Sequence, residues 1–404
     1  MKIVIVGFGL AGFTACRWIL NNAPGNEVEI FSDERYPYYP HPALYGVLSG
    51  EATVEDILIH PAEWYTARQV KLRLGEPVKS VNVDDKEIVL ESGERVSYDK
   101  LLLASGAHPF VPPIEGVDRK GVFTLRTIDD ALRIREYAQG KKNAVVIGGG
   151  LLGLEISAAL GKLGLKVTIL EFAPWLLPRQ IDKEGSDVLI RELEKKDVKI
   201  KCGAQTEEIL GNAEVSGVKT KDGETLPAEL VVCATGIRSN TELPRESGIE
   251  VNRGVVVDDN LRTSAEDVYA AGDIAEHRGR VYGIIPAAAE QAQIAATNML
   301  GKETVYTGTV SMNSLKVVGV DLTSIGLVNP ENEEYEQIRR VDAEKCLYKK
   351  IVLKNGKVVG GILIGDRKSV KPLTEIIRRK VDVEKVKHKL LDEGFDFKRL
   401  VTKK

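Results

Sequence analysis

The chain contains 404 residues, enough for roughly two or three domains with large apolar cores. Its 56 Lys and Arg residues nearly balance its 59 Asp and Glu residues, so its charge gives no indication of binding to nucleic acid or to a membrane surface. No apolar segment is long enough to span a bilayer, which argues against a membrane-spanning protein.

The chain opens on a short apolar segment that is followed by closely spaced glycines. Residues 2–6 are apolar and mostly β-branched, which is typical of a strand buried on both faces of a parallel sheet. Glycines then follow at the spacing G-x-G-x-x-G, before a predicted helix over residues 13–20. Glycines at this spacing allow a sharp turn, the approach of a pyrophosphate, and close packing of helix on strand. We therefore predict a dinucleotide site at Gly7, Gly9, Leu10, Ala11 and Gly12; a purely structural turn is the alternative.

A second strand is predicted over residues 27–31, and its end should present an acid to the 2′-hydroxyl of a ribose. Ser32 occupies the first candidate position, so Asp33 or Glu34 would have to make this contact. The alternative is that both acids are solvated loop residues.

A loop rich in Pro and Tyr follows at residues 36–45. Its three prolines fix backbone angles, which suits a rigid wall beside a flat ring system. A strand over residues 100–104 then ends at Ser105 and Gly106, and a cluster of prolines at residues 109–113 is expected to be a linker.

A second copy of the opening motif begins at residue 143. A predicted strand leads into Gly148, Gly150 and Gly153, and a further strand over residues 166–170 ends at Glu171. Two complete motifs imply two nucleotide sites. Because a carboxylate accepts hydrogen bonds from a ribose diol and repels a 2′-phosphate, Glu171 favours NADH over NADPH; an exposed acid without this role is the alternative.

Two later segments complete the predicted sites. An apolar strand ends at Gly272 and Asp273, which places a carboxylate where ligands bind in open α/β sheets. An alanine-rich buried helix is predicted over residues 285–300, with its N-terminus near the same site.

From about residue 305 the pattern changes to Val-rich alternating segments. A hairpin signal at Asn355 and Gly356 indicates a small α+β domain. The last stretch, residues 371–404, is predicted to be helical and carries more basic than acidic residues. A solvated helical face explains this charge; a docking surface for an acidic partner protein is the alternative.

The four cysteines, Cys16, Cys202, Cys233 and Cys346, lie far apart and match no zinc or disulfide pattern. We therefore expect a reduced cytoplasmic setting, buried structural thiols and no bound metal. Charged residues make up 28% of the chain, and His, Met and Cys are few, a composition that fits a thermophile.

Taken together, these motifs resemble the FAD-dependent pyridine nucleotide–disulfide oxidoreductase superfamily. The resemblance covers essentially the whole chain and rests on the two glycine motifs, Glu171, and the segments Ala104–Gly106, Ala234–Gly236 and Gly272–Asp273. It implies an α/β fold with two Rossmann-like domains, for FAD and NAD, and a small C-terminal α+β domain. The implied boundaries are 1–108 and 235–303 for the FAD domain, 109–234 for the NAD(P)H domain, and 304–404 for the C-terminal interface domain.

Within this superfamily the chain is most similar to NADH:rubredoxin reductases, to the flavoprotein part of nitrite reductases, and to NADH oxidases without a redox cysteine. It carries no Cys-x-x-x-x-Cys pair, and His41 stands where related disulfide reductases have their redox cysteine. Two residues depart from the pattern: Ser105 replaces a threonine, and His41 replaces a lysine of the rubredoxin reductases.

The resemblance implies an NADH dehydrogenase, a monomer or homodimer, that passes electrons through FAD directly to a small acidic electron-carrier protein such as rubredoxin or ferredoxin. An NADH oxidase and a non-catalytic NADH-responsive flavoprotein are the alternatives. The expected catalytic residues are His41, Arg126 and Glu155. The alternatives are that His41 is an ordinary loop histidine, that Arg126 forms a surface ion pair, and that Glu155 is a charge at the start of a helix. The remaining expected cofactor contacts are Pro42, Val78, Ala104, Ser105, Gly106, Leu151, Leu152, Gly236 and Pro286, with Asp273 on the ribityl chain of FAD.

Overall fold

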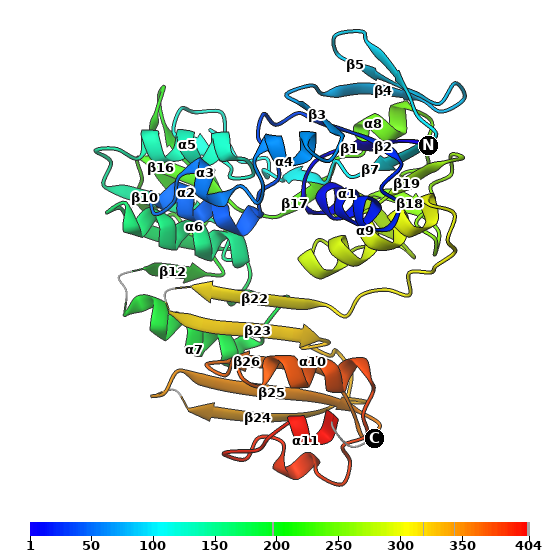
Figure 1. The fold of residues 1–404 in the computed structure, drawn as a ribbon. Coiled ribbons are helices and arrows are strands. Elements are labelled where there is room, and N and C mark those ends of the chain that lie inside the picture. Colours follow the sequence, from blue (N-terminus) through cyan, green and yellow to red (C-terminus); the bar gives the residue numbers. More distant parts are fainter. Residues whose placement is uncertain (196–197, 318, 343, 402–404) are drawn as a thin grey trace.

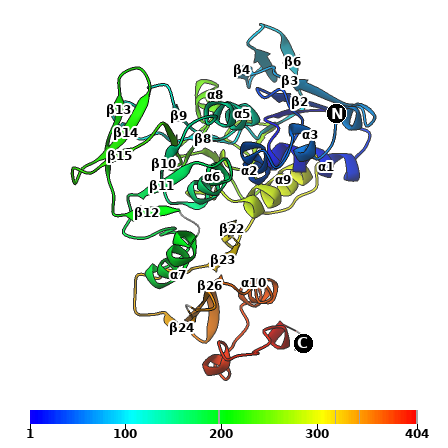
Figure 2. The ribbon, with the colours of Figure 1, turned by 90° about the vertical axis from the view of Figure 1, so that its left-hand side faces the viewer.

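The computed structural model describes residues 1–195, 198–317, 319–342 and 344–401. Three five-stranded sheets organise these residues into three bodies (Figures 1 and 2). Two of the sheets are entirely parallel and are flanked by helices, and the third is antiparallel. The predicted α/β fold with two Rossmann-like units and a C-terminal α+β unit is confirmed. None of the described helices is both long and apolar enough to cross a membrane.

The first body is built around β1, the central strand of a parallel sheet ordered β19–β7–β1–β2–β3. Four of the five β1 residues are buried, which agrees with the continuous apolar pattern of this segment. Helices α1 (Leu10–Asn22) and α9 (Ile285–Met299) pack side by side against this sheet (Figure 1). The strands are β1 (Lys2–Val6), β2 (Glu27–Ser32), β3 (Val70–Leu74), β7 (Lys100–Leu103) and β19 (Val268–Ala270).

Smaller elements cover the edges of the first body. Two three-stranded sheets are ordered β4–β5–β6 and β18–β20–β21. Their strands are β4 (Val78–Asn82), β5 (Glu87–Leu90), β6 (Arg95–Ser97), β18 (Val255–Val257), β20 (Ala275–His277) and β21 (Arg280–Val281). The short helices are α2 (Leu44–Ser49), α3 (Val54–Ile57), α4 (Ala62–Thr66) and α8 (Glu242–Glu246), with the 3₁₀ turn η1 (His41–Ala43).

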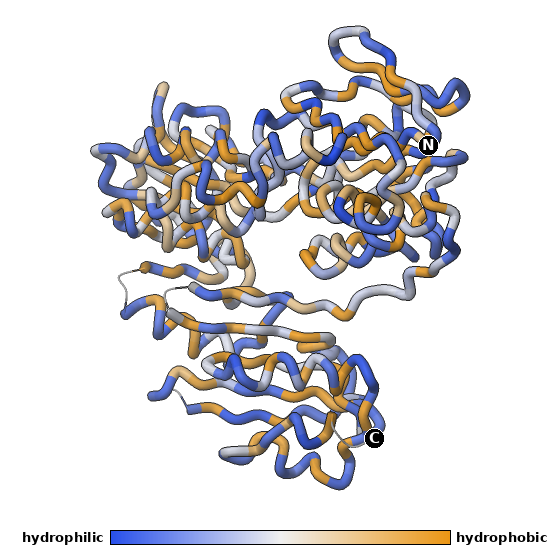
Figure 3. The backbone as a smooth tube through the Cα atoms, in the orientation of Figure 1, coloured by the Kyte–Doolittle hydropathy of each residue, from blue (hydrophilic) through white to orange (hydrophobic). Residues whose placement is uncertain are grey.

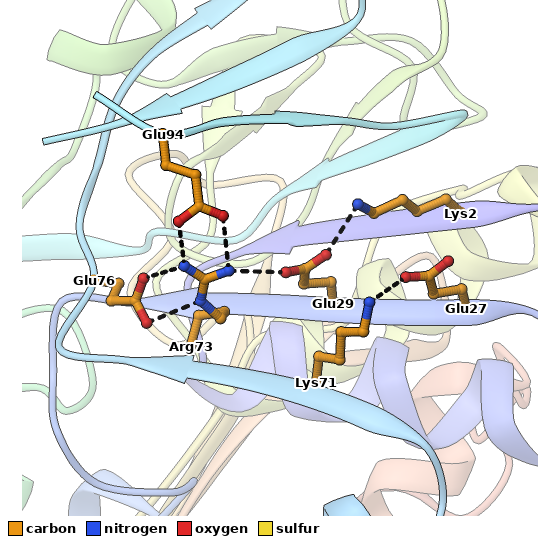
Figure 4. Close-up of polar contacts among 7 residues, drawn as sticks. All are labelled: Lys2, Glu27, Glu29, Lys71, Arg73, Glu76 and Glu94. Atoms are coloured by element: carbon orange, nitrogen blue, oxygen red, sulfur yellow. Dashed lines mark hydrogen bonds and ion pairs between the residues drawn. The ribbon is translucent and has the colours of Figure 1, made fainter. Parts of the chain in front are cut away.

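A network of ion pairs ties β3, the outer strand of the first sheet, to its neighbours (Figure 4). The Arg73 guanidinium lies between three carboxylates, with its Nη2 atom 2.7 Å from Glu94 Oε2 and its Nη1 atom 3.3 Å from Glu29 Oε1. Glu29 is buried and also pairs with Lys2 at 3.0 Å. Each of the three cations in this cluster, Lys2, Lys71 and Arg73, pairs with a carboxylate, so the network holds the sheet edge together.

The second body contains a parallel sheet ordered β12–β11–β10–β16–β9, with β10 at its centre. Its strands are β9 (Val122–Phe123), β10 (Asn143–Ile147), β11 (Lys166–Glu171), β12 (Lys199–Cys202) and β16 (Leu230–Cys233). The helices are α5 (Ile128–Tyr137), α6 (Leu151–Lys162) and α7 (Lys183–Glu194). A three-stranded sheet of β13 (Thr206–Gly211), β14 (Val215–Thr220) and β15 (Thr225–Pro227) extends it.

Two kinds of contact join the first and second bodies. The chain leaves the first body along β8 (Ala107–Pro109) and returns along β17 (Ile237–Ser239), and these strands pair antiparallel. In addition, α2 packs on α5 and α6 of the second body, and all three share one apolar core (Figure 1). The second body therefore lies, in sequence, between β7 and β19 of the first sheet. The predicted domain boundaries stay a prediction.

The third body is an antiparallel sheet ordered β22–β23–β26–β25–β24. Helix α10 (Val370–Arg378) packs on one of its apolar faces, and α7 of the second body packs on another group of its buried residues. Orange stretches follow its long strands in Figure 3. The strands are β22 (Met312–Val317), β23 (Val320–Gly326), β24 (Glu336–Asp342), β25 (Leu347–Lys354) and β26 (Lys357–Ile364).

The hairpin predicted at Asn355 and Gly356 is confirmed, since these residues join β25 to β26 with φ angles of +50° and +72°. The helix predicted over residues 371–404 is wrong for most of its length. Beyond α10, only η2 (Lys387–Lys389) and α11 (Lys398–Val401) are helical, and residues 402–404 lie outside the described residues. Left-handed backbone at Lys380 and Gly394 ends the helical path, although buried residues spaced seven apart imitate a helical pattern: Val383, Leu390 and Phe397.

Candidate functional site

The first glycine turn joins β1 to α1 and leaves no room for side chains at two of its positions. Gly7 has a φ angle of +102°, and a Cβ atom there would lie 2.3 Å from the carbonyl oxygen of Ala104. A Cβ atom on Gly12 would lie 2.1 Å from the carbonyl oxygen of Gly7. Around Gly9, by contrast, no described atom lies within 4 Å of that position. The turn is therefore closed on its inner side and open beside the start of α1.

The second glycine turn, between β10 and α6, repeats this geometry. A Cβ atom on Gly148 would lie 2.4 Å from the carbonyl oxygen of Ala234, and one on Gly153 would lie 1.9 Å from that of Gly148. Gly150 again faces open space among the described atoms. Both helices begin after a glycine cap that gives no side-chain hydrogen bond, and neither has an acid in its first turn. Each turn thus presents free N–H groups and the positive end of a helix dipole, which suits a pyrophosphate.

Three segments distant in sequence meet near the first turn. The Arg126 side chain lies against Gly106, and its Nη2 atom is 3.4 Å from Asp273 Oδ2. Gly272 has a φ angle of +88°, and its N–H donates to the buried Gln291 side chain at 2.9 Å. The Ser105 hydroxyl is buried and has no hydrogen-bond partner among the described residues. Because an orphaned buried hydroxyl is costly, Ser105 indicates that a polar ligand completes this site.

The two acids predicted to follow β2 differ in their surroundings. Asp33 is exposed, whereas Glu34 is partly buried and accepts a hydrogen bond from the Tyr39 hydroxyl. Burial raises the pKa of Glu34 to about 7, against the lowering effect of that hydrogen bond. Glu34 is therefore held in a fixed position beside the Pro- and Tyr-rich loop, and the reading of both acids as solvated loop residues does not apply to it.

A cleft lies between the first and second bodies. It draws residues from the Pro- and Tyr-rich loop, from the segment before α5, from α6, and from both strands that cross between the bodies. The lining residues are His41, Leu44, Tyr45, Pro109, Leu125, Arg126, Leu152, Ile156, Cys233, Ala234, Gly236 and Ile237. Two of the three predicted catalytic residues, His41 and Arg126, are thus brought together here.

His41 begins η1 and is half-buried in this cleft. Burial and the neighbouring Arg126 charge lower the pKa of His41 to about 3. The imidazole is therefore neutral at physiological pH, while Arg126 supplies a fixed positive charge. A reading of His41 as a solvated loop residue does not fit this environment.

Two family models match the chain. The pyridine nucleotide-disulphide oxidoreductase model matches residues 1–296, and the rubredoxin NAD+ reductase C-terminal domain matches residues 312–381. The chain belongs to the pyridine nucleotide-disulphide oxidoreductase family. This family comprises pyridine nucleotide-dependent oxidoreductases that use FAD, and the two glycine motifs of this chain agree with it.

Individual relatives agree with this family. The chain is 30% identical to the NADH-rubredoxin oxidoreductase of Clostridium acetobutylicum, covering 90% of this chain and 91% of that protein. The crystal structure of NADH:rubredoxin oxidoreductase from that organism has a TM-score of 0.81 at 29% identity, covering 96% and 97% of the two chains. A nitrite reductase of Bacillus subtilis is 40% identical over 95% of this chain. The chain spans about half the length of that enzyme, 48%.

Glu155, the third predicted catalytic residue, lies in the second turn of α6, where it is partly buried. It follows the cleft residue Leu152 by three positions but is not itself one of the residues that line the cleft. The reading of Glu155 as a helix-start charge is wrong, because the first turn of α6 contains no acid. Burial raises the pKa of Glu155 to about 7, so its charge changes near neutral pH. The nearby Tyr45, which the sequence did not single out, lines the cleft. Burial and the Glu155 charge raise the pKa of its hydroxyl.

The acid of the second site, Glu171, is held by the backbone of the flavoprotein. Its Oε2 atom accepts from the Gly149 N–H at 2.6 Å, and its Oε1 atom accepts from the Ala173 N–H at 2.7 Å. Phe172 beside it is 72% exposed and faces away from the core. Glu171 is therefore not a freely solvated acid, since its carboxylate is pinned beside the second glycine turn.

The remaining predicted contacts lie at varied depth. Val78 packs against the first apolar core, Pro42 is exposed in η1, and Pro286 is in the first turn of α9. Leu151 packs toward the third body, whereas Leu152 is 42% exposed at the cleft. Leu10 and Ala11 begin α1, and a Cβ atom on Gly272 would lie 3.0 Å from that of Ala11.

Two of the four thiols, Cys16 and Cys233, are buried as the sequence predicts, whereas Cys202 and Cys346 are partly exposed. Cys16, which lies nearest the first glycine turn in sequence, is fully buried, and burial raises its pKa to about 12. Cys233 lines the cleft instead, at the end of β16, and burial raises its pKa to about 11. Both sulfurs stay protonated near neutral pH, so neither is a ready nucleophile.

The open space at Gly9 gives a first test. Gly9→Ala should leave the fold intact, because the new methyl group meets no described atom, but should release FAD more readily by obstructing the pyrophosphate. We expect about a tenfold weaker flavin affinity, or about 1.4 kcal/mol, measured by flavin fluorescence on dilution. Gly25→Ala, at an exposed loop glycine with equal free space, is the matched control. Unchanged flavin retention in Gly9→Ala would remove the first turn from the FAD site.

The raised pKa of Glu155 gives a second test. An acid whose pKa is raised on folding adds stability below its unfolded pKa and loses it as the pH rises through about 7. Glu155→Gln should therefore stabilise the protein by about 1–2 kcal/mol more at pH 8 than at pH 5, after allowance for solvent screening. Denaturant unfolding at both pH values measures this difference. The exposed Glu136→Gln should show no such difference; equal behaviour of the two variants would contradict the buried environment of Glu155.

Proposed function

We propose that this flavoprotein takes a hydride from NADH and passes the electrons directly to a small electron-carrier protein such as rubredoxin or ferredoxin. The observation that carries the proposal is the cleft between the first and second bodies, which is lined by His41 and Arg126 and by no pair of thiols among the described residues. A protein dithiol would need two neighbouring sulfurs, and Cys233 is the one thiol that lines the described cleft.

The named relatives support this choice of acceptor. Both the C-terminal family model and the Clostridium acetobutylicum relative carry rubredoxin in their names. A solved structure with a TM-score of 0.89 and 27% identity is a complex of putidaredoxin reductase with putidaredoxin, and covers 99% of this chain. These likenesses concern those proteins, and they make a small redox protein the first acceptor to test.

We assign the FAD contacts to the first turn and its neighbours. Gly7, Gly9 and Gly12 would hold the pyrophosphate, Asp273 would accept hydrogen bonds from the ribityl hydroxyls, and Ser105 would gain the partner that it lacks. When bound, FAD supplies the chemistry that accepts a hydride and releases electrons singly. Arg126 provides the fixed positive charge of the cleft, and the neutral His41 offers a hydrogen bond without adding charge.

We assign NADH to the second turn. Gly148, Gly150 and Gly153 would hold its pyrophosphate, and Glu171, already oriented by two backbone N–H groups, would accept from the ribose diol. Glu155 lies further along α6, next in sequence to the cleft residue Ile156, and is our choice for orienting the nicotinamide end. The whole arrangement positions two reactants and excludes water, which is the main contribution expected of the protein.

The proposal is tested by anaerobic titration with NADH, followed by addition of rubredoxin with cytochrome c as terminal acceptor. We expect about one hydride equivalent per FAD and reduction of cytochrome c that depends on rubredoxin. Cys16→Ser and Cys233→Ser should retain this turnover. Uptake of two hydride equivalents per FAD, or loss of turnover in either variant, would indicate a mechanism that uses a protein thiol. If NADH is consumed as fast with dioxygen alone as with rubredoxin, the protein is an oxidase. If turnover is slow with every acceptor, the protein is an NADH-responsive sensor.

The coenzyme preference gives a separate prediction. Wild-type protein should prefer NADH in kcat/KM, because the pinned Glu171 carboxylate repels a 2′-phosphate. Glu171→Gln should lower kcat/KM for NADH by about tenfold, the loss of about 1.4 kcal/mol expected for a charged hydrogen bond. It should also narrow the gap to NADPH. Steady-state kinetics with ferricyanide measure both coenzymes, and a wild-type preference for NADPH would contradict the assignment of Glu171.

A further inference from the structure

The loop that follows Glu171 is bonded to the third body. We infer that side chains of the C-terminal sheet position the NADH site: Asn329, Tyr348 and Lys350 hold the loop over residues 172–182 and through it the acid Glu171. This inference rests on the proposed binding of NADH at the second glycine turn. It assigns to the third body a part in coenzyme binding, although none of these three residues belongs to the body that carries the second glycine turn.

The far end of the loop is fixed at Asp182. Its Oδ1 atom caps α7 by accepting from the Gly185 N–H at 3.1 Å. Its Oδ2 atom accepts from the Tyr348 hydroxyl at 2.7 Å and from Lys350 Nζ at 2.9 Å. Burial opposes ionisation of Asp182, but the hydrogen bonds from Lys350 and Tyr348 keep its pKa below the usual range. The carboxylate therefore joins α7 of the second body to β25 of the third by charge-assisted bonds.

Lys350 is only 2% exposed, so its ammonium group requires a carboxylate partner. A buried ammonium group is very costly unless a carboxylate and further acceptors satisfy it. Within the described residues its hydrogen-bond partners are Asp182 and, at 3.5 Å, the Asn329 side-chain oxygen. The third body can therefore leave the loop only by exposing this cation to water or by leaving it unpaired, so the docked position is well defined.

Asn329 binds the middle of the loop directly. Its amide nitrogen donates to the carbonyl oxygens of Pro178 at 3.1 Å and Ile181 at 2.9 Å. Both backbone acceptors belong to the second body, while Asn329 follows β23 of the third. A single side chain thus satisfies two loop carbonyls, which would otherwise need water or a different backbone path.

The near end of the loop touches the nucleotide turn itself. The Leu177 N–H donates to the carbonyl oxygen of Gly149 at 3.2 Å, and a Cβ atom on Gly149 would lie 2.5 Å from Leu176 Cδ2. The Gly149 N–H in turn donates to Glu171. Leu176 and Leu177 are fully buried in the core that α7 shares with the third body. A continuous series of packed and hydrogen-bonded groups therefore runs from Lys350 to Glu171.

The inference is tested in the holoenzyme with ligands that do or do not contain the adenosine half of NADH. Lys350→Met should weaken binding of ADP-ribose about fivefold or more, within the usual range of coupling between sites. It should raise KM for NADH by a similar factor and leave kcat unchanged. Reduced nicotinamide mononucleotide has no adenosine half, so its kcat/KM with ferricyanide should not change. Titration calorimetry and steady-state kinetics measure these quantities.

Lys349→Met is the matched control, because Lys349 is on the same strand and pairs with Asp366 inside the third body, away from the loop. Lys349→Met should leave the affinity for ADP-ribose, the KM for NADH and the kcat/KM for reduced nicotinamide mononucleotide unchanged. Tyr348→Phe and Asn329→Ala retain the Lys350 charge pair, so they test the inference if Lys350→Met does not fold. Each should show the same selective loss for ADP-ribose to a smaller degree.

Unchanged ADP-ribose affinity in these variants would overturn the positioning role. An equal loss of kcat/KM for NADH and for reduced nicotinamide mononucleotide would overturn it too. Failure of the proposed function would be visible earlier, as the absence of ADP-ribose binding and NADH oxidation in wild-type protein.

Discussion

One steric contact recurs at both candidate nucleotide sites, and the arrangement around them depends on it. In each parallel sheet the first glycine of the turn presses against the carbonyl oxygen of an alanine at the end of the neighbouring strand: Gly7 on Ala104, and Gly148 on Ala234. The third glycine then presses against the carbonyl oxygen of the first. Because these contacts are between backbone atoms, side-chain rearrangement cannot relieve them. They bring the start of the helix close to the next strand end, where Ser105 and Gly236 lie.

Burial in and around the cleft between the bodies disfavours charge on three side chains, of which only His41 lines the cleft itself. Burial raises the pKa of Glu34 and Glu155 and lowers that of His41, so each of these groups is driven toward its neutral form. Arg126 remains the fixed charge, in contact with Asp273. An environment of this kind would suit a flat, largely apolar ring system and would still provide hydrogen bonds at its edges. It also explains why the thiol of Cys233 is protonated although it lines the same space.

Sequence patterns predicted the parts of the fold that local chemistry determines. The glycine spacings gave both turns, the apolar runs gave β1 and β10, and Asn355 with Gly356 gave a hairpin. Contacts between segments far apart in sequence were not predictable in this way. Nothing in the neighbourhood of Cys233 places it at the cleft, and nothing near Lys350 indicates that its partner is Asp182. The C-terminal error has the same origin, since apolar spacing cannot show where left-handed residues redirect the chain.

The sharing of apolar cores has a consequence for how the molecule unfolds. One core combines α2, from the N-terminal part of the chain, with α5 and α6 of the second body, and another combines α7 with the sheet of the third body. The second body therefore has two apolar surfaces that other parts of the chain cover. Excised by itself, it would expose both surfaces to water, which is a condition for aggregation. The three bodies have separate sheets, but they share apolar cores. Unfolding of one body therefore exposes apolar residues of its neighbour, which couples their unfolding.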